Sequence, residues 1–125
     1  GSLAMRVLLA DDEPDIRYLY RQMLEGCGYQ VDEAADGREV LELIEGGTFD
    51  LVIMDLYMPN VDGFEAIGLI RAKDSQVPII VMTGHYPERV VSKRIKGLGV
   101  NKVLRKPVMI TSLMTAVREV AGAAA

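Results

Sequence analysis

Short apolar runs rich in β-branched residues alternate along the chain with segments of helical periodicity. Three runs, at residues 6–10, 51–54 and 79–82, are almost uninterrupted, whereas the runs at 29–34 and 100–104 alternate between apolar and polar positions. An uninterrupted run is typical of a strand buried on both faces of a parallel sheet, and an alternating run suits a strand nearer an edge. The pattern therefore predicts five strands, two of them near the sheet edges.

Five amphipathic helices are predicted between and after these strands. Pro14 suits a first helical turn, Asp36 is a favourable N-cap, and Pro87 opens a further helix. Glycines at the carboxyl ends of the first, second and fourth segments are expected to end those helices. The predicted helices lie at about residues 14–26, 37–46, 64–70, 87–97 and 108–120. Strict strand–helix alternation indicates an α/β fold, a doubly wound parallel sheet with right-handed crossovers and helices on both faces.

Chemically distinctive side chains follow four of the five predicted strands. In folds of this class the ligand lies at the carboxyl ends of the strands, near the topological switch point. We therefore expect these side chains to form one site. In strand order they are Asp11, Asp12 and Glu13 after the first, Asp55 after the third, Thr83 and Gly84 after the fourth, and Lys106 after the fifth.

The acidic residues of this set suit a hard cation. Carboxylates crowded at one edge repel one another, and a cation with oxygen ligands relieves the repulsion. Mg²⁺ usually takes one or two protein carboxylates and keeps several waters. We expect Asp12 and Asp55 as direct ligands and Asp11 as a ligand through water. The alternative is that the acids near residue 12 only cap the following helix.

Asp55 is also a candidate nucleophile, because a carboxylate can attack phosphorus and form an aspartyl phosphate. Phosphoryl transfer needs mainly in-line positioning and neutralisation of charge on the phosphoryl oxygens. Mg²⁺ and the ammonium group of Lys106 would supply that charge, and Thr83 would donate a hydrogen bond.

Composition limits the class of protein. The 125 residues are 50% hydrophobic and 26% charged, which is the balance of one globular domain. No apolar run is long enough to span a bilayer, so we expect no membrane insertion. The single cysteine, Cys27, excludes an internal disulfide, and we expect a reducing, cytoplasmic compartment. The domain should cover residues 5–121, with 1–4 as an expression scar and 122–125 as an alanine-rich tail.

Four motifs at matching spacings resemble the receiver domain of bacterial two-component response regulators, including chemotaxis regulators. They are Asp11-Asp12, Asp55-Leu56-Tyr57-Met58-Pro59 with Asp62-Gly63, Thr83, and Lys106-Pro107. The resemblance extends from about Arg6 to Val120. It implies a flavodoxin-like, five-stranded parallel sheet with strand order 2-1-3-4-5 and five helices.

The resemblance also implies a role for each matched residue. Asp55 would accept a phosphoryl group from a sensor histidine kinase or a histidine phosphotransfer protein. Asp12 and Asp55 would bind Mg²⁺ or Mn²⁺ directly, Asp11 through water, and Tyr57 through its backbone carbonyl. Thr83 and Lys106 would be the switch hydroxyl and the phosphate-binding lysine.

A domain of this kind assists its own phosphorylation and dephosphorylation and is not otherwise an enzyme. Phosphorylation would switch a face that binds a downstream protein or an output domain, and a phosphorylation-dependent homodimer remains open. The alternative function is a phosphorylation-independent pseudo-receiver that acts only as a protein-interaction module. An isolated receiver protein and a domain of a longer protein both fit the sequence.

Two features depart from the usual family pattern. Val103 occupies the place three residues before the lysine where the family commonly has Tyr or Phe, which puts the usual threonine–aromatic coupling in doubt. Tyr57 and His85 occupy places that, in the family, border the acyl phosphate. We hypothesise that they partly shield it from water; the alternative is that they are exposed rim aromatics.

Other phosphate-handling classes fit the residues less well. A flavodoxin-type flavin carrier needs a Ser/Thr/Gly-rich loop where this chain has Asp11-Asp12-Glu13. A haloacid-dehalogenase-like phosphatase needs a second acid at the place of Tyr57. The glycine pairs at residues 26–28 and 97–99 precede strands, so they are not dinucleotide fingerprints.

Charge is distributed unevenly. Fifteen of the 18 acidic residues lie in residues 1–65, whereas ten of the 14 basic residues lie in residues 66–125. No aromatic residues are interleaved with these bases, so direct nucleic-acid binding is disfavoured. We expect an acidic protein partner or an asymmetric ion-pairing interface at the basic residues of the fourth helix and fifth strand. These are Arg89, Lys93, Arg94, Lys96, Lys102 and Arg105.

Overall fold

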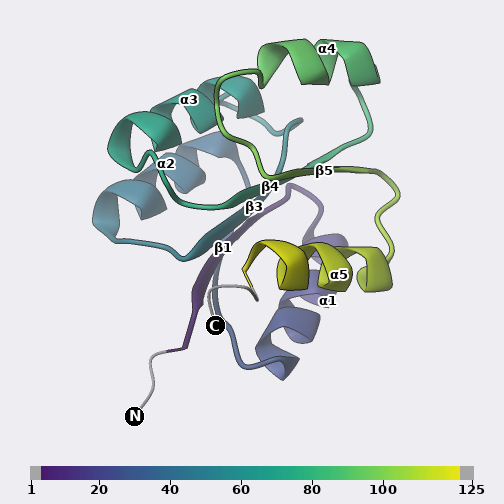
Figure 1. Ribbon diagram of the computed structural model, residues 1–125. Helices are drawn as coiled ribbons and strands as arrows, with labels where there is room; N and C mark the ends of the chain where they lie inside the picture. The colour runs from purple at the N-terminus through teal and green to yellow at the C-terminus, as the bar shows by residue number, and fades with distance from the viewer. Residues whose placement is uncertain (1–3, 122–125) are drawn as a thin grey trace.

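The computed structural model describes residues 4–121 as strands and helices in strict alternation (Figure 1). The strands are β1 (Arg6–Ala10), β2 (Gln30–Ala34), β3 (Leu51–Asp55), β4 (Ile79–Thr83) and β5 (Lys102–Arg105). The helices are α1 (Pro14–Gly26), α2 (Gly37–Gly46), α3 (Gly63–Lys73), α4 (Glu88–Arg94) and α5 (Ile110–Val120). The predicted order and type of every element are confirmed.

The sheet is parallel, with strand order β2-β1-β3-β4-β5. Both weakly patterned strands, β2 and β5, lie at the edges. Every residue of β3 and β4 is buried, whereas exposed and partly buried residues alternate along β5. The doubly wound α/β fold with order 2-1-3-4-5 is therefore confirmed.

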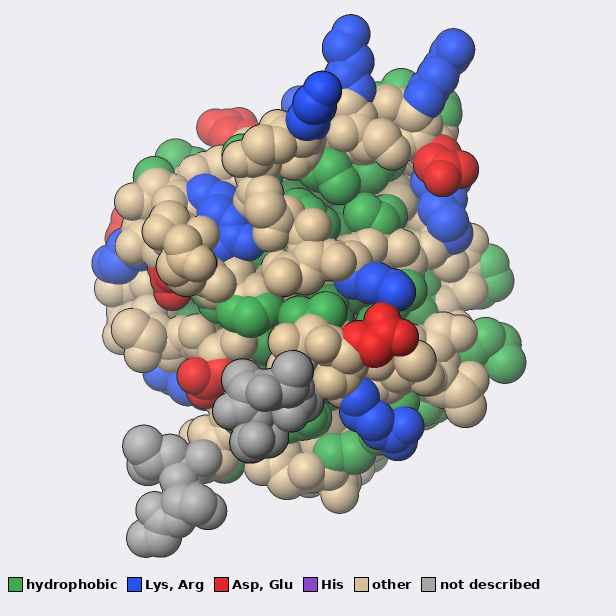
Figure 2. Space-filling view, viewed as in Figure 1, with side chains coloured by type: hydrophobic (Ala, Val, Ile, Leu, Met, Phe, Trp, Pro, Cys, Tyr) green, Lys and Arg blue, Asp and Glu red, His purple; other side chains and the backbone are tan. Residues whose placement is uncertain are grey.

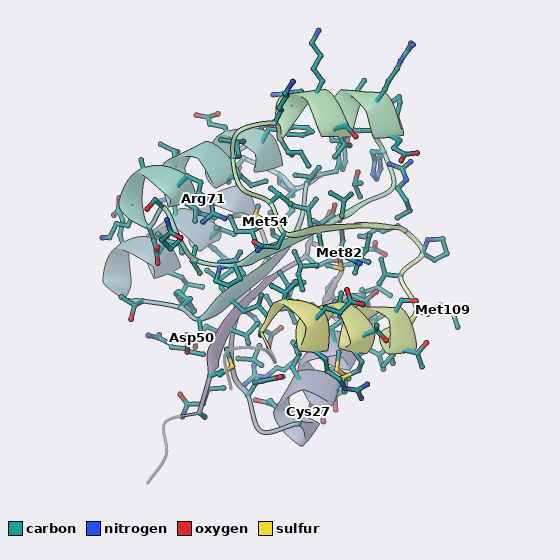
Figure 3. All side chains as sticks on the ribbon, viewed as in Figure 1. Cys27, Asp50, Met54, Arg71, Met82 and Met109 are labelled. Atoms are coloured by element: carbon teal, nitrogen blue, oxygen red, sulfur yellow. The ribbon has the colours of Figure 1, made fainter. Side chains whose placement is uncertain are left out.

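Two hydrophobic cores separate the helices from the sheet. α2, α3 and α4 pack on one face, and α1 and α5 on the other (Figure 1). Successive residues of the central strands enter opposite cores. Along β3, Met54 belongs to the first core and Ile53 to the second, and along β4, Met82 belongs to the second core and Val81 to the first (Figure 3). This alternation is what a central parallel strand requires.

Helix boundaries differ from prediction mainly near the carboxyl end. α4 ends at Arg94 instead of near Gly97, and a run of turns containing Gly97 at φ 83° leads to β5. β5 begins at Lys102, one residue after Asn101, whose backbone N–H donates to the Ile79 carbonyl at 2.9 Å and whose side-chain oxygen accepts from the Ile79 N–H at 2.9 Å. At the second helix the prediction is confirmed, because the Asp36 carboxylate caps the Glu39 N–H.

Some predicted features lie outside the described residues. These are the alanine-rich tail at 122–125 and, apart from Ala4, the expression scar at 1–4.

Cys27 follows α1 and is exposed (Figure 3). Across residues 4–121, none of the helices has the length and apolar character needed to cross a bilayer.

Candidate functional site

The predicted site residues meet at one edge of the sheet because four neighbouring strands end there. Asp11 directly follows β1, Asp55 and Thr83 are the last residues of β3 and β4, and Lys106 follows β5. Asp11 and Thr83 are fully buried, and Asp55 is 2% exposed. Rigid central strands therefore fix the positions of these groups.

Three carboxylates form the acidic part of the site. One oxygen from each of Asp11, Asp12 and Asp55 lies within 4.8 Å of the others. Burial raises the pKa of Asp11, although the Glu13 N–H and the charge of Lys106 partly oppose this. An all-oxygen donor set with crowded negative charge fits a hard divalent cation such as Mg²⁺.

The alternative role of these acids as helix caps is not supported. Glu13 is the N-cap residue of α1 and makes no side-chain capping bond. The Asp11 carboxylate accepts a hydrogen bond from the Glu13 N–H at 2.9 Å, which shapes the loop before the helix. After β3, the Tyr57 N–H likewise donates to the Asp55 carboxylate at 3.0 Å. Metal binding by the Tyr57 carbonyl stays a prediction.

Lys106 supplies the positive charge of the site. Its ammonium group donates to Asp55 at 2.5 Å and to Asp11 at 3.2 Å, and it lies 3.5 Å from Glu13. Burial alone would lower the pKa of Lys106, but the hydrogen bond and charge of Asp55, together with Asp11, raise it well above its usual value. The amine is therefore an ammonium cation at neutral pH. Gly84 permits this approach, since an added Cβ would lie 3.0 Å from the Lys106 Cβ.

Thr83 carries an unused hydrogen-bonding group. Within the described residues, its hydroxyl oxygen is buried and has no hydrogen-bond partner. A buried unsatisfied hydroxyl costs about 1–3 kcal/mol. An acceptor that enters the site would recover this energy, so the hydroxyl is suited to sense an added anionic group.

Comparison with known proteins identifies this arrangement. The model of the response regulator receiver domain matches residues 7–118. The chain belongs to this family. The sensor protein EvgS of Escherichia coli O157:H7 is 40% identical over 113 residues, covering 89% of this chain and 9% of EvgS. Response regulator MprA of Mycolicibacterium vanbaalenii is 36% identical, covering 93% of this chain and 50% of MprA.

A solved receiver domain shows the same fold. The receiver domain of the sensor histidine kinase PA1611 from Pseudomonas aeruginosa superposes with a TM-score of 0.84 at 29% identity, covering 96% of this chain and 99% of that one. It was solved with magnesium coordinated in its active-site cleft. The present receiver domain spans half or less of the curated relatives described above. A pseudo-receiver is not favoured, since the acids, threonine and lysine are all present.

Aromatic side chains that follow β3 and β4 pack against one another and against α3. The Tyr57 and His85 rings stack, with centroids 3.9 Å apart and planes 12° apart. Tyr86 packs edge-on against Phe64 at 5.1 Å, and the Arg94 guanidinium lies over Phe64 at 3.9 Å. The sequence identified the first pair as neighbours of the site. It did not reveal the contacts of Phe64, Tyr86 and Arg94, because these join separate elements.

Arg17 is a positioning residue that sequence reasoning missed. Its guanidinium donates to the backbone carbonyl of Asp11 at 2.6 Å and to Glu33 at 2.7 Å. Arg21 of the same helix also pairs with Glu33. Burial acts to raise the pKa of Glu33, but its hydrogen bonds with Arg21 and Arg17 outweigh this and lower it. These bonds connect α1 and β2 to the backbone of Asp11 in the acidic site.

Proposed function

We propose that Asp55 of this receiver domain accepts a phosphoryl group from a phosphohistidine. The donor is a sensor histidine kinase or a histidine phosphotransfer protein. A carboxylate oxygen of Asp55 attacks phosphorus, the phosphorus–nitrogen bond breaks, and the imidazole leaves with its electron pair. The observation that carries the proposal is the buried Asp55 carboxylate, 2.5 Å from the Lys106 ammonium group at the end of a central strand.

The acidic residues would hold the metal. Asp12 and Asp55 would ligate Mg²⁺ or Mn²⁺ directly, Asp11 through water, and Tyr57 through its carbonyl. When bound, the cation supplies positive charge to the phosphoryl oxygens. The proximity of the three carboxylates and the magnesium in the PA1611 receiver domain support this assignment.

The remaining polar residues would respond to the new charge. Lys106 exchanges its bond to the Asp55 carboxylate for one to a phosphoryl oxygen. The Thr83 hydroxyl, which has no partner among the described residues, donates to another phosphoryl oxygen. Movement of Thr83 shifts the loop before α4, and a two-state equilibrium of this loop and of the α4–β5 face carries the signal.

The proposal includes a cellular setting for this chemistry. The domain, residues 5–121, is a phosphorylation switch in the cytoplasm and assists only its own phosphorylation and dephosphorylation. Its output would be a downstream protein or an attached domain, and a homodimer formed on phosphorylation is a further outcome. Sensor and regulator relatives such as EvgS and MprA support this setting.

Labelling by a small phosphodonor tests the proposal. Incubation with phosphoramidate and Mg²⁺ should add one phosphoryl group to the chain, measured by intact mass, and a chelator should prevent it. Asp55→Asn should abolish labelling. Asp50→Asn, the same change at the exposed opposite end of β3, should retain it.

Two outcomes would overturn the assignment. Labelling of Asp55→Asn at the original level would place the phosphoryl group elsewhere. If the unaltered protein resists labelling and saturating beryllofluoride with Mg²⁺ leaves the amide signals of Asp55 and Thr83 unchanged, the chain is an interaction module.

A further inference from the structure

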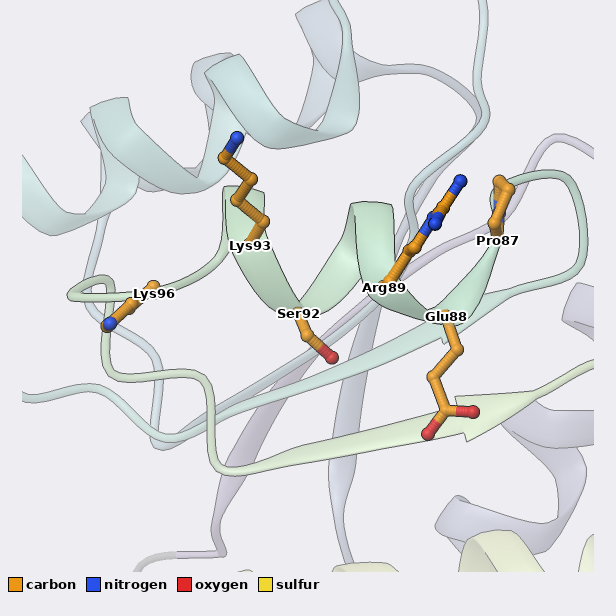
Figure 4. Close-up of a pocket in the computed structure, with 6 residues that line it drawn as sticks. All are labelled: Pro87, Glu88, Arg89, Ser92, Lys93 and Lys96. Carbon is orange, nitrogen blue, oxygen red and sulfur yellow. The ribbon is translucent and has the colours of Figure 1, made fainter.

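Lys106 is held much more firmly than the lysines of the surface. Its side chain is 18% exposed, and its ammonium group contacts Asp55 and Asp11. By contrast, lysine and arginine side chains extend from the surface over α4 (Figure 2). Lys93 and Lys96 in this region are exposed and lie along an open groove of about 780 Å³ (Figure 4). A lysine has a flexible four-carbon stem, so its position in a site depends on how firmly its backbone is held.

Two hydrogen bonds within residues 4–121 hold the backbone around Lys106. Its own N–H donates to the Thr83 carbonyl at 2.9 Å. On the other side, the hydroxyl of Tyr20 in α1 donates to the Val108 carbonyl at 2.8 Å. Pro107 lies between these two bonds and lacks an N–H, so it cannot add a backbone donor. Tyr20 therefore fixes one end of the segment at residues 106–108.

Packing is incomplete on one side of this segment. Lys106, Pro107 and Val108 border a hollow of about 400 Å³, which Tyr20 also lines. Closely packed atoms restrain a segment, whereas a hollow removes neighbouring contacts and leaves room for movement. We therefore expect the hydrogen bond from Tyr20 to contribute strongly to the position of the segment.

The hydrophobic core does not require the Tyr20 hydroxyl. Tyr20 is 3% exposed and belongs to the same core as Leu9 and Leu113. Phenylalanine would place the same ring there, whereas a buried tyrosine hydroxyl needs a hydrogen-bond partner. Burial, together with the charge of Asp11, raises the pKa of Tyr20, so the hydroxyl keeps its proton and donates at neutral pH. The use of this hydroxyl is its bond to the Val108 carbonyl.

α1 contacts the backbone of both the acidic and the basic part of the site. Arg17 lies three residues before Tyr20, on the same side of the helix, and donates to the Asp11 carbonyl at 2.6 Å. Tyr20 donates to the segment that carries Lys106. α1 packs with α5 on one face of the sheet (Figure 1). One helix thereby sets the position of an acid relative to that of the lysine.

We propose that Tyr20 is a positioning residue, which holds the Lys106 ammonium group at Asp55 through the hydrogen bond to the Val108 carbonyl. The inference rests on the proposed function, in which Lys106 neutralises a phosphoryl oxygen. Loss of the hydroxyl would leave the bond to Thr83 and release the Val108 end of the segment. Lys106 would then keep its charge and lose its fixed position.

Nuclear magnetic resonance of the free protein tests the positioning directly. Tyr20→Phe keeps the ring and should shift the Lys106 side-chain signals and lower the order parameter of that side chain. Tyr18→Phe, the same change at a 63% exposed position of α1, should leave these signals unaltered. Incorporation of p-aminophenylalanine at position 20 supplies an N–H donor at the same place and should restore them.

Binding of beryllofluoride with Mg²⁺, followed by amide signals, tests the consequence for the site. A hydrogen bond to a charged group contributes about tenfold to a hundredfold in affinity, and Tyr20→Phe should lose part of this, roughly fivefold. In a Lys106→Met background, Tyr20→Phe should change the affinity by less than about twofold, because no lysine is left to position. In a Lys93→Met background, the exposed-lysine control, the roughly fivefold effect should persist.

Specific results would overturn the proposal. Unchanged Lys106 signals in Tyr20→Phe would make Tyr20 a packing residue, even if the variant is less stable. Equal weakening in the Lys106→Met and Lys93→Met backgrounds would show that Tyr20 does not act through Lys106. Circular dichroism confirms that each variant is folded. If the unaltered protein neither accepts a phosphoryl group nor binds beryllofluoride, the proposed function fails, and the Lys106 signals of the free protein still decide whether Tyr20 positions the lysine.

Discussion

Arg71 of α3 joins α3 to the turn that precedes β5 (Figure 3). Its guanidinium donates to the backbone carbonyls of Leu98 and Val77 at 2.6 Å each, of Gly99 at 2.9 Å and of Asp74 at 3.3 Å. Burial lowers the pKa of Arg71, and the charge of Asp74 partly offsets this. One side chain therefore holds both the entry to β4 and the connection from α4 to β5.

Replacing Arg71 with Met keeps the aliphatic stem and removes every donor. The bonds to Leu98 and Val77 are short and partly buried, and a hydrogen bond to a charged group contributes about 1.5–3 kcal/mol. The bond to Gly99 is exposed and that to Asp74 is long, so we count neither. We expect the free energy of unfolding to fall by about 3–6 kcal/mol, out of about 5–15 kcal/mol for a typical domain.

Urea unfolding followed by circular dichroism measures this change, and hydrogen exchange at residues 95–101 locates it. Lys73→Met is the matched control, because its exposed ammonium group makes one long bond of 3.4 Å to Glu45. It should change stability by less than about 0.5 kcal/mol. Arg71→Lys should restore only part of the loss, since an ammonium group lacks the planar fork of donors. A decrease below about 1 kcal/mol in Arg71→Met would refute the reasoning.

Three further predictions concern the site and its surroundings. Thr83→Val removes the unpartnered buried hydroxyl, so the free energy of unfolding should rise by about 1–2 kcal/mol while the response of α4 amide signals to beryllofluoride is lost. Thr83→Ser should keep the response, and a less stable Thr83→Val would contradict this account. Glu33 has a lowered pKa, so it contributes stability above its ordinary value of 4.5 that is lost as pH falls through its folded-state value. Glu33→Gln should therefore be destabilising at about pH 7, and its effect should shrink progressively as pH falls below 4.5. Glu42→Gln, at an exposed pair, should have little effect at any pH, and an effect of Glu33→Gln that stays constant with pH would rule the linkage out. Replacing Tyr57 and His85 with Ala should speed hydrolysis of the phosphorylated protein, measured by intact mass over time; an unchanged decay would leave the stacked pair as rim aromatics.

Most of the fold could be predicted because it depends on local patterns. Uninterrupted apolar runs marked β1, β3 and β4, and the weaker runs marked the edge strands. Boundaries near the carboxyl end were less certain from sequence, because distant contacts decide them. The Asn101 side chain takes the Ile79 N–H just before β5 begins, and α4 stops early at turns that contain Gly97 in a left-handed conformation.

The predicted site residues also came together, for a topological reason. Residues that follow neighbouring parallel strands must share one edge of the sheet, so Asp11, Asp55, Thr83 and Lys106 could be grouped before any distance was known. Arg17 and Arg71 were not identified. Each acts through backbone carbonyls, and a carbonyl carries no residue-type signal in a sequence.

By itself, the sequence determined the order of elements, which strands are central, and the chemical groups that follow each strand. These properties depend on neighbours along the chain, through side-chain periodicity and capping. Only the tertiary structure decided that Lys106 contacts Asp55, 51 residues away, and that the Thr83 hydroxyl finds no partner among residues 4–121. The physical reason is that hydrogen bonds and ion pairs depend on distances of a few ångströms between distant segments, and packing sets those distances.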